Sequence, residues 1–412
     1  ASLVESMDRA AFWRRLAETI ALFGDGHTSA SPPYEIVQAY MMEGGRLFPW
    51  EIDLQDRQAF VTREFLAEPL IPPGSEVMEI NERPIGDLID ELGACISAEK
   101  QTTRVEFLER NLVNLFTLVY GWGESFTLRI TPPDGESRTV TASGITVTEY
   151  QANSGRQAGA RGAPWAFQRL EEGRIGYLDF RSFSDPDGFA RFLEEMFSDI
   201  SNDPVEALII DLRLNGGGNS RLGDMLLGYL TGEPWIQVAR MDIKMSRQIK
   251  AYYRSGIPRI FRWAPGFLVA LANRGVRQMF SARTGEIVSF HTEPSHPPDN
   301  PLRYNGKVYV LTGPRTFSSA TMFATTVKDH GFATLVGEET GGLASHFGDV
   351  YTFYLPHTRL RLGVSHKFFL RPSREDDGRG CLPDVEVITT PDDRAAGRDP
   401  VLERTLGMIP PG

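Results

Sequence analysis

The chain has 412 residues, of which 41% are hydrophobic and 24% are charged, and its formal net charge at pH 7 is −11. A chain of this length exceeds what one hydrophobic core supports, so we expect two or three folding units. Lys and Arg are scattered along the sequence, which together with the negative net charge disfavours a nucleic-acid partner, because phosphate binding depends on clustered basic side chains.

Cysteine, histidine and hydropathy patterns exclude several further classes. Cys95 and Cys381 are too few for a disulfide framework or a cysteine-based zinc site, so we expect two buried, inert thiols. The histidines include no His-Glu-x-x-His pair, which argues against a metal enzyme. No apolar run reaches the roughly 18 residues of a membrane span, so no transmembrane segment is expected. The first residues also lack the pattern of a secretion signal, although a signal removed before residue 1 stays open.

The N-terminal segment, residues 1–45, is predicted to be helical. Phe12, Trp13, Leu16 and Ile20 recur at helical spacing, and Gly24 supplies the left-handed residue that commonly ends a helix. The sequence Asp-Gly-His-Thr at 25–28 therefore falls on a loop directly after a helix.

Residues 46–148 are interpreted as a β-rich module. Strand-like runs occur at 59–61 and 76–80, a helix-like stretch occurs at 107–120, and the runs 125–130 and 138–148 flank Pro-Pro-Asp-Gly, which predicts a hairpin. Residues 149–164 include many small and flexible residues, and they predict a linker.

Residues 165–412 are predicted to form an α/β core. Apolar runs at 175–180, 207–210 and 308–311 are typical of buried strands, and helical stripes follow each of them. Repeated strand and helix units favour a largely parallel sheet. The segment 231–300 interrupts this pattern with aromatic and arginine residues; we favour a helical subdomain packed on the core over a lid that covers substrate.

Two strand-to-helix turns carry the candidate chemistry. The first is DLRLNGGGN at 211–219, whose glycines expose backbone N–H groups at a helix N-terminus and suit a phosphate or an oxyanion. The spacing that phosphate sites require is missing, and taken alone the turn would be structural, with Asp211 and Arg213 supporting it. Ser220, in an incomplete G-x-S-x-G pattern, is predicted to be a helix cap.

The second turn is GPRTFSSATMF at 313–323. One helix needs one capping hydroxyl, so Thr316, Ser318 and Ser319 leave at least one hydroxyl available for chemistry. His27 by itself is more often a structural residue than a catalyst, and spacing alone does not connect it to a serine.

Four stretches in order, GDGHT (24–28), IIDLRLNGGGN (209–219), PRTFSSATMFATTVKDHGFATLVGEETGG (314–342) and DGRGCLPDVEV (377–387), resemble the tail-specific or C-terminal processing serine peptidases, especially their tricorn-core branch. The resemblance implies an α/β core related to ClpP and crotonase. It also implies a PDZ-like module inserted ahead of that core, where residues 46–148 lie.

The resemblance also implies catalytic roles. Ser318 would be the nucleophile and His27 the general base, and the backbone N–H groups of Gly217 and Ser319 would form the oxyanion hole. Asp377 falls where tricorn-type enzymes carry a supporting Glu. No metal or organic cofactor is required, and the expected partner is a peptide or unfolded protein; the oligomeric state stays open.

The sequence departs from the family pattern at several positions. Leu343 stands where the tail-specific branch carries its lysine, which favours the Ser/His arrangement. Gly26 replaces the serine that precedes the histidine in tricorn-like enzymes, so another group must orient the imidazole. His346 and Lys367 remain weaker candidates for the base. No carboxylate-binding Gly-Leu-Gly-Phe-like loop occurs near Phe60.

Two other functions stay open. One is a ligand-binding relative that has lost catalysis, which the aromatic segment 231–300 favours and the retention of Ser318 and His27 opposes. The other is hydrolysis of non-peptide esters or amides, since the same nucleophile serves any acyl transfer. Relatives often act outside the cytoplasm, so a periplasmic or secreted location also stays open.

Overall fold

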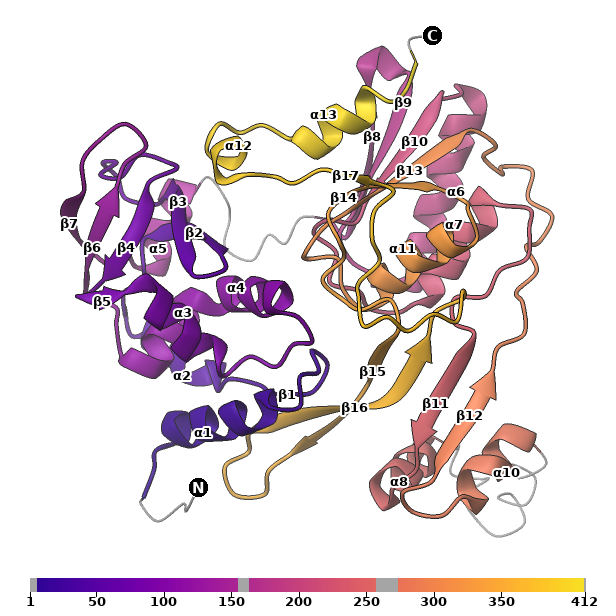
Figure 1. Cartoon of the computed structure of the whole chain (residues 1–412), viewed down its shortest axis with the longest axis horizontal. Helices are drawn as coiled ribbons and strands as arrows, with labels where there is room; N and C mark the ends of the chain where they lie inside the picture. Colours follow the sequence, from indigo (N-terminus) through magenta and orange to yellow (C-terminus); the bar gives the residue numbers. More distant parts are fainter. Residues whose placement is uncertain (1–5, 155–162, 257–272, 411–412) are drawn as a thin grey trace.

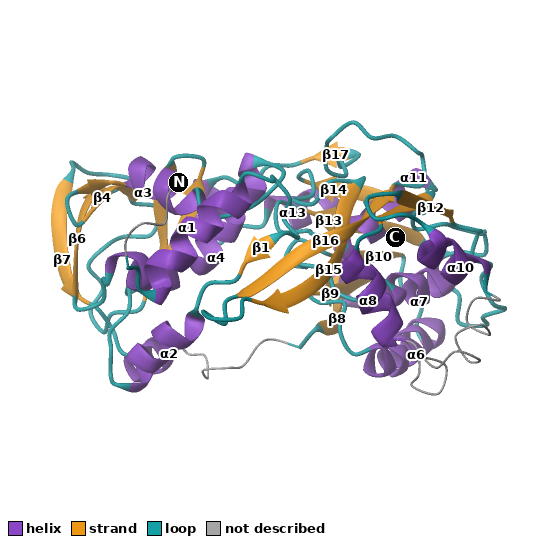
Figure 2. Cartoon of the chain, turned by 90° about the horizontal axis from the view of Figure 1, so that it is seen from below, coloured by secondary structure: helices purple, strands orange, loops and turns teal. Residues whose placement is uncertain are grey.

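The computed structural model describes residues 6–154, 163–256 and 273–410, which form a mixed α/β structure built on three sheets (Figure 1). One lobe contains an antiparallel sheet and most of the N-terminal half. The other contains a mostly parallel sheet covered by helices. A third, antiparallel sheet runs along the lower edge of the molecule in Figure 1, crosses the middle of the view in Figure 2, and joins the two lobes.

The first lobe is a six-stranded antiparallel sheet with order β2-β3-β4-β6-β7 and β5 paired to β4. Its strands are β2 (Trp50–Gln55), β3 (Gln58–Glu64), β4 (Glu76–Ile80), β5 (Arg83–Pro84), β6 (Ser125–Thr131) and β7 (Arg138–Ser143). Its helices are α1 (Arg9–Ala21), α2 (Tyr34–Met42), α3 (Ile85–Gly93), α4 (Gln101–Tyr120) and α5 (Val147–Ser154). The strands predicted at 59–61, 76–80 and 125–130, the hairpin, the helix predicted at 107–120 and the helix predicted before Gly24 are thus confirmed. The strand predicted at 138–148 is too long, because β7 ends at Ser143.

The N-terminal helical segment shares the core of this lobe. Trp13 of α1 and Val37 of α2 belong to the same buried cluster as Trp50 and Phe116. The described part of this segment, residues 6–45, is therefore packed on the β-rich module and does not form a separate unit. The predicted linker is wrong at its start, because α5 extends to Ser154; residues 155–162 lie outside the described residues.

The second lobe is a six-stranded sheet with order β17-β14-β13-β10-β9-β8, in which only β8 runs antiparallel to its neighbour. Its strands are β8 (Trp165–Leu170), β9 (Ile175–Phe180), β10 (Ala207–Asp211), β13 (Lys307–Thr312), β14 (Thr334–Gly337) and β17 (Val385–Glu386). The accompanying helices are η1 (Glu171–Gly173), α6 (Pro186–Asn202), α7 (Arg221–Leu230), α11 (Ser319–Asp329), α12 (Pro391–Ala395) and α13 (Pro400–Leu406).

Helices cover both faces of this sheet, which explains its continuous apolar strands. Leu193, Leu226 and Phe323, from α6, α7 and α11, pack in one buried cluster, and Val401 of α13 packs in another. Since β10 and β13 are parallel neighbours, the turns that follow them meet at one edge of the sheet. These are the two turns that the sequence singled out.

The third sheet has order β1-β16-β11-β12, with β15 paired to β16. Its strands are β1 (Ser29–Ala30), β11 (Arg240–Lys244), β12 (Ile287–His291), β15 (His346–Tyr354) and β16 (Arg361–Leu370). Antiparallel pairing of β1 with β16 brings the N-terminal segment onto the C-terminal half of the chain. This pairing places the histidine loop, which directly precedes β1, beside the second lobe.

The expectation of a helical subdomain at 231–300 is wrong in part. Strands β11 and β12 pair with each other and extend the third sheet, and a small cluster around Ile243 and Val288 packs them against α8 (Arg247–Gly256). Helix α10 (Arg274–Ser281) is the other described helix of the segment 231–300, and residues 257–272 lie outside the described residues.

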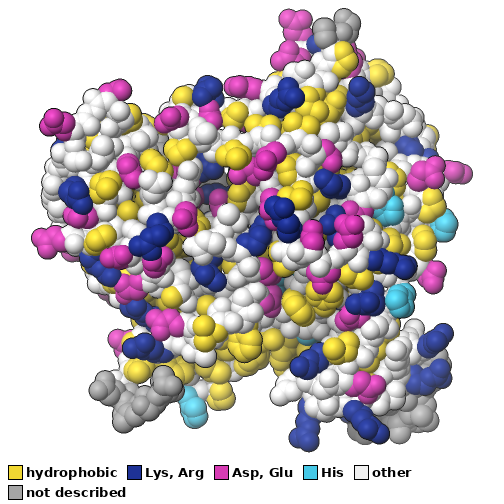
Figure 3. Space-filling model, viewed as in Figure 1, with side chains coloured by type: hydrophobic (Ala, Val, Ile, Leu, Met, Phe, Trp, Pro, Cys, Tyr) yellow, Lys and Arg dark blue, Asp and Glu magenta, His cyan; other side chains and the backbone are white. Residues whose placement is uncertain are grey.

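The surface carries both signs of charge, interspersed over most of the face in Figure 3, and is hollowed at its lower edge between the N-terminal segment and the lobe that bears α8 and α10. Within the described residues, no helix is long and apolar enough to cross a membrane. Cys95 and Cys381 are buried, unpaired thiols, as predicted, and burial raises the pKa of each to about 11.

Candidate active site

Ser318 lies between β13 and α11 in an unusual backbone conformation. Its φ of 56° and ψ of −123° fall in a region that costs a non-glycine residue on the order of 1–3 kcal/mol. It occupies the N-cap position, yet its hydroxyl makes no capping bond. Thr316 instead fixes the turn, because its Oγ1 donates to Leu212 O at 2.8 Å. The expected spare hydroxyl is therefore that of Ser318.

His27 lies on a loop that Asp25 organises. The buried carboxylate of Asp25 accepts from the backbone N–H of His27 at 3.0 Å, from Thr28 Oγ1 at 2.5 Å and from the hydroxyl of Ser365 on β16. The Oγ of Ser97 accepts from the Asp25 N–H at 3.1 Å and donates to its carbonyl at 2.8 Å. The loop is thus anchored to both the first lobe and the third sheet.

The structure brings His27 and Ser318 together across 291 residues of sequence, with Nε2 of His27 at 2.9 Å from Oγ of Ser318. The imidazole stacks on Phe317 with ring centroids 4.7 Å apart, and His346 stacks beside it at 5.9 Å. Burial lowers the pKa of His27, and the Asp25 carboxylate partly opposes this shift. A neutral imidazole at neutral pH is the form that can accept a hydroxyl proton.

Gly217 and Ser319 lie against the same serine. Gly217 has a φ of +94°, and a Cβ added there would lie 2.8 Å from both Ser318 Cβ and Ser319 N, so only glycine fits. Ser319 begins α11, where a first-turn N–H has no intrahelical acceptor. The N–H of Gly217, however, donates to Asn215 Oδ1 at 2.8 Å. Gly217 can therefore bind an oxyanion only by sharing or leaving this bond.

Asn215 is a site residue that the sequence reasoning missed. It is fully buried, its side-chain Nδ2 donates to Phe180 O at 2.7 Å, and its backbone carbonyl accepts from Phe317 N–H at 3.0 Å. It thus connects the glycine turn to the serine turn. Its only sequence signal is its place before the three glycines.

The other residues that the sequence named as candidates, Asp377, His346 and Lys367, have no hydrogen bond to Ser318 among the described residues. Asp377 is exposed, and its carboxylate accepts from the N–H of Arg379 at 3.0 Å; no contact with His27 is seen among the described residues. Burial lowers the pKa of His346 to about 4, and Lys367 pairs with Asp349. Among the described residues, the hydroxyl of Ser318 therefore has a hydrogen bond to His27 and none to His346 or Lys367.

Ser220 occupies the N-cap position of α7, as predicted, but its side chain makes no capping hydrogen bond.

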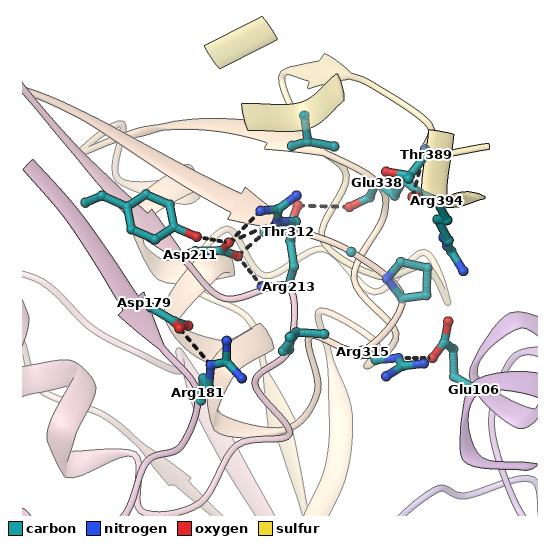
Figure 4. Close-up of a pocket in the computed structure, with 15 residues that line it drawn as sticks. Glu106, Asp179, Arg181, Asp211, Arg213, Thr312, Arg315, Glu338, Thr389 and Arg394 are labelled. Atoms are coloured by element: carbon teal, nitrogen blue, oxygen red, sulfur yellow. Dashed lines mark hydrogen bonds and ion pairs between the residues drawn. The ribbon is translucent and has the colours of Figure 1, made fainter. Parts of the chain in front are cut away.

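A cavity of about 400 Å³ lies beside the residues that lead into both turns (Figure 4). Figure 4 shows ion pairs between Asp179 and Arg181, between Asp211 and Arg213, and between Glu106 and Arg315. Arg213 pairs with Asp211 at 2.6 Å and with Asp399 at 2.6 Å, and Arg315 pairs with Glu106 at 2.6 Å. Asp211 and Arg213 therefore support the glycine turn, in agreement with the sequence interpretation.

Among the described residues, one group could hold a metal ion: Asp25, His27 and Glu99, whose ligand atoms lie within 4.8 Å of one another. Asp25 already accepts three hydrogen bonds, and Nε2 of His27 faces Ser318. These atoms fit a hydrogen-bond network better than a metal centre. The expectation that no metal is needed remains a prediction.

A family model described as peptidase family S41 matches residues 174–387, which include Gly217 and Ser318 but not His27. Among solved structures, mature CPAF is 17% identical over 96% of this chain and 86% of its own, with a TM-score of 0.66. The structure of mature CPAF complexed with lactacystin is 17% identical over 97% of this chain and 88% of its own, with a TM-score of 0.61. The photosystem II D1 C-terminal processing protease is 15% identical over 94% of this chain and 84% of its own, with a TM-score of 0.46. At such identities the CPAF structures show a shared fold alone.

Proposed function

The chain belongs to peptidase family S41 and is a serine-type peptidase, and on this premise we propose that Ser318 is its nucleophile and His27 its general base. The single observation that carries the assignment is the 2.9 Å contact between Nε2 of His27 and Oγ of Ser318. The histidine loop and the serine turn, which are 291 residues apart in sequence, converge to make this contact, and the glycine turn packs against the serine turn. The hydroxyl is held in a strained backbone and is not used for capping.

The reaction follows from this geometry. His27 Nε2 takes the hydroxyl proton as Ser318 Oγ bonds to the scissile carbonyl carbon. The N–H of Ser319 binds the oxyanion, and the N–H of Gly217 joins it by sharing or leaving its bond to Asn215 Oδ1. His27 then gives the proton to the leaving amine as the C–N bond breaks. Water attacks the acyl-enzyme with His27 again as base, which frees the new carboxyl terminus and restores Ser318. No cofactor enters these steps.

We propose that the substrate is an extended peptide or unfolded protein and that the enzyme cuts within the chain as an endopeptidase. The second lobe would then be a ClpP/crotonase-like core and the first lobe a PDZ-like module. The six-stranded antiparallel sheet with α3 and α4 supports the latter assignment. Recognition of a substrate's C-terminal carboxylate predicts faster cleavage of a peptide with a free C-terminus than of its amide.

The test is digestion of a denatured protein mixture by the wild type and by Ser318→Ala, with product ends read by mass spectrometry. Ser220→Ala is the matched control, since it removes a serine hydroxyl from the other turn. We expect cleavage by the wild type and the control and none by Ser318→Ala. Activity retained in Ser318→Ala would exclude this nucleophile. Cleavage of simple esters but not of peptides would assign a different hydrolase.

A covalent probe gives a second readout. CPAF has been crystallised with lactacystin. If the active sites correspond, lactacystin should modify this chain at Ser318, and peptide mapping should find the adduct there. An adduct on another residue would contradict the assignment.

A further inference from the structure

The residue that precedes His27 has no side chain, and the structure shows why. A Cβ added to Gly26 would lie 2.8 Å from the ring of Phe317 and 2.9 Å from Oε2 of Glu99. Real Cβ contacts are essentially never this short. The space that a serine would need at this position is therefore occupied in part by the carboxylate of Glu99.

Glu99 carries a buried carboxylate to which the proposed mechanism has so far given no role. Both of its oxygens are buried without a hydrogen-bond partner in the described structure, and so is Nδ1 of His27. Burial raises the pKa of Glu99, while the nearby Gly26 N–H lowers it. Buried polar atoms that lack partners are costly and rare, so complementary orphan groups in one place indicate an interaction.

The geometry leaves Glu99 as the acceptor for His27. The ligand atoms of Asp25, His27 and Glu99 lie within 4.8 Å of one another. Asp25 already binds the backbone N–H of His27 together with two hydroxyl groups. Nε2 of the imidazole faces Ser318, so Nδ1 is the nitrogen left to meet a carboxylate.

The position of Glu99 is fixed from the second lobe. Lys100, the next residue, donates to Glu339 Oε1 at 2.9 Å and to Thr340 O at 2.5 Å. Thr103, in the first turn of α4, donates to Gly341 O at 2.6 Å. The start of α4 is thus tied to the loop after β14, which holds Glu99 in place relative to the serine turn.

We propose that Glu99 is the positioning residue of this site: its carboxylate accepts a hydrogen bond from Nδ1–H of His27, directly or through one water, and keeps Nε2 unprotonated toward Ser318. The proposal rests on the proposed roles of Ser318 and His27. Glu99 then orients the imidazole of His27, in place of the serine that precedes the histidine in tricorn-like enzymes. The exposed Asp377 is not needed for this role. A carboxylate in this role selects the tautomer and stabilises the imidazolium.

Kinetics of Glu99 variants are the first test. Glu99→Leu keeps the bulk and removes both acceptors, so kcat should fall about 10²- to 10⁴-fold with KM changed less than about threefold, as expected for a lost tautomer-setting carboxylate. Glu99→Gln keeps one acceptor oxygen and should retain clearly more activity than Glu99→Leu. Glu338→Leu, at another largely buried carboxylate whose pKa burial raises, is the matched control and should keep the wild-type kcat.

Histidine ¹⁵N NMR tests the same idea without turnover. The His27 signals, assigned with His27→Gln, should report the Nδ1–H tautomer in the wild type and a shift toward Nε2–H in Glu99→Leu. If Glu99→Leu does not fold, judged by thermal unfolding, Glu99→Ala takes its place. A purely structural role for Glu99 would lower stability and leave the tautomer unchanged.

Several outcomes would overturn the proposal. They are a kcat of Glu99→Leu within about threefold of wild type, unchanged His27 signals, or wild-type activity that EDTA removes and Zn²⁺ restores, which would make the cluster a metal site. Absence of peptide cleavage in the wild type would count against the proposed function alone, because the tautomer measurement still decides the role of Glu99.

Discussion

Replacing Gly217 with alanine tests the close approach of the two catalytic turns. The residue has a φ of +94°, and the new Cβ would lie 2.8 Å from Phe317 O, from Ser318 Cβ and from Ser319 N. A positive φ costs an L-residue roughly 1–2 kcal/mol. Two of the three contacts are backbone atoms, so no side-chain rotation can relieve them, and the turns must move apart.

This separation should act on the transition state more than on substrate binding. Losing one oxyanion donor typically costs about 2.7–4 kcal/mol, or about 10²- to 10³-fold in kcat. Gly217→Ala should therefore lower kcat by that factor with little change in KM. The measurement is steady-state cleavage of a peptide that contains one site found in the protein digest.

Gly331→Ala is the matched control. Gly331 also has a positive φ, +72°, but an added Cβ there meets no atom within 4 Å. It should lose on the order of 1 kcal/mol of stability in urea unfolding and keep its kcat. The reasoning fails if Gly217→Ala cleaves within about threefold of wild type, or if both alanine variants lose activity equally.

Two further predictions concern stability. The side chains of Arg371 and Asp329 are 8% and 5% exposed and pair at 2.6 Å, so Arg371→Met should cost about 3–5 kcal/mol by leaving a buried charge unpaired. Arg174→Met, which breaks the more exposed pair with Glu206, should leave the urea midpoint almost unchanged, because water screens an exposed ion pair. Equal urea midpoints would contradict this. Burial lowers the pKa of His346 from 6.5 to about 4 in the folded chain. As the pH drops from about 6.5 to about 4, the unfolded chain therefore binds a proton at this residue before the folded chain does, and the free energy of unfolding falls. His346→Gln should make the free energy of unfolding, measured in urea, less dependent on pH over this range.

Local sequence determined most of the elements. Helical stripes predicted α1, α6 and α7, and continuous apolar runs predicted β10 and β13, because the period of a side-chain pattern depends only on neighbours along the chain. The same patterns placed both catalytic turns between a strand and a helix. The family resemblance then selected Ser318 and His27 from several hydroxyls and histidines.

Predictions from the sequence patterns were wrong where the secondary structure depended on contacts with residues far away in the chain. The segment 231–300 has many aromatic residues, yet β11 forms a strand because it pairs with β12 and β16. The start of the predicted linker is helical in α5, where Phe65 and Tyr150 pack with ring centroids 4.6 Å apart. Neither pairing leaves a signal in the local pattern.

Only the tertiary structure decided how the site is assembled. The contact between His27 and Ser318 exists because β1 pairs with β16 and because Asp25 binds Ser365 on that strand. The same docking places Glu99 where a side chain at position 26 would have to lie. Hydrogen bonds between residues hundreds of positions apart depend on how the lobes pack, so sequence determined the chemical groups and packing determined which of them meet.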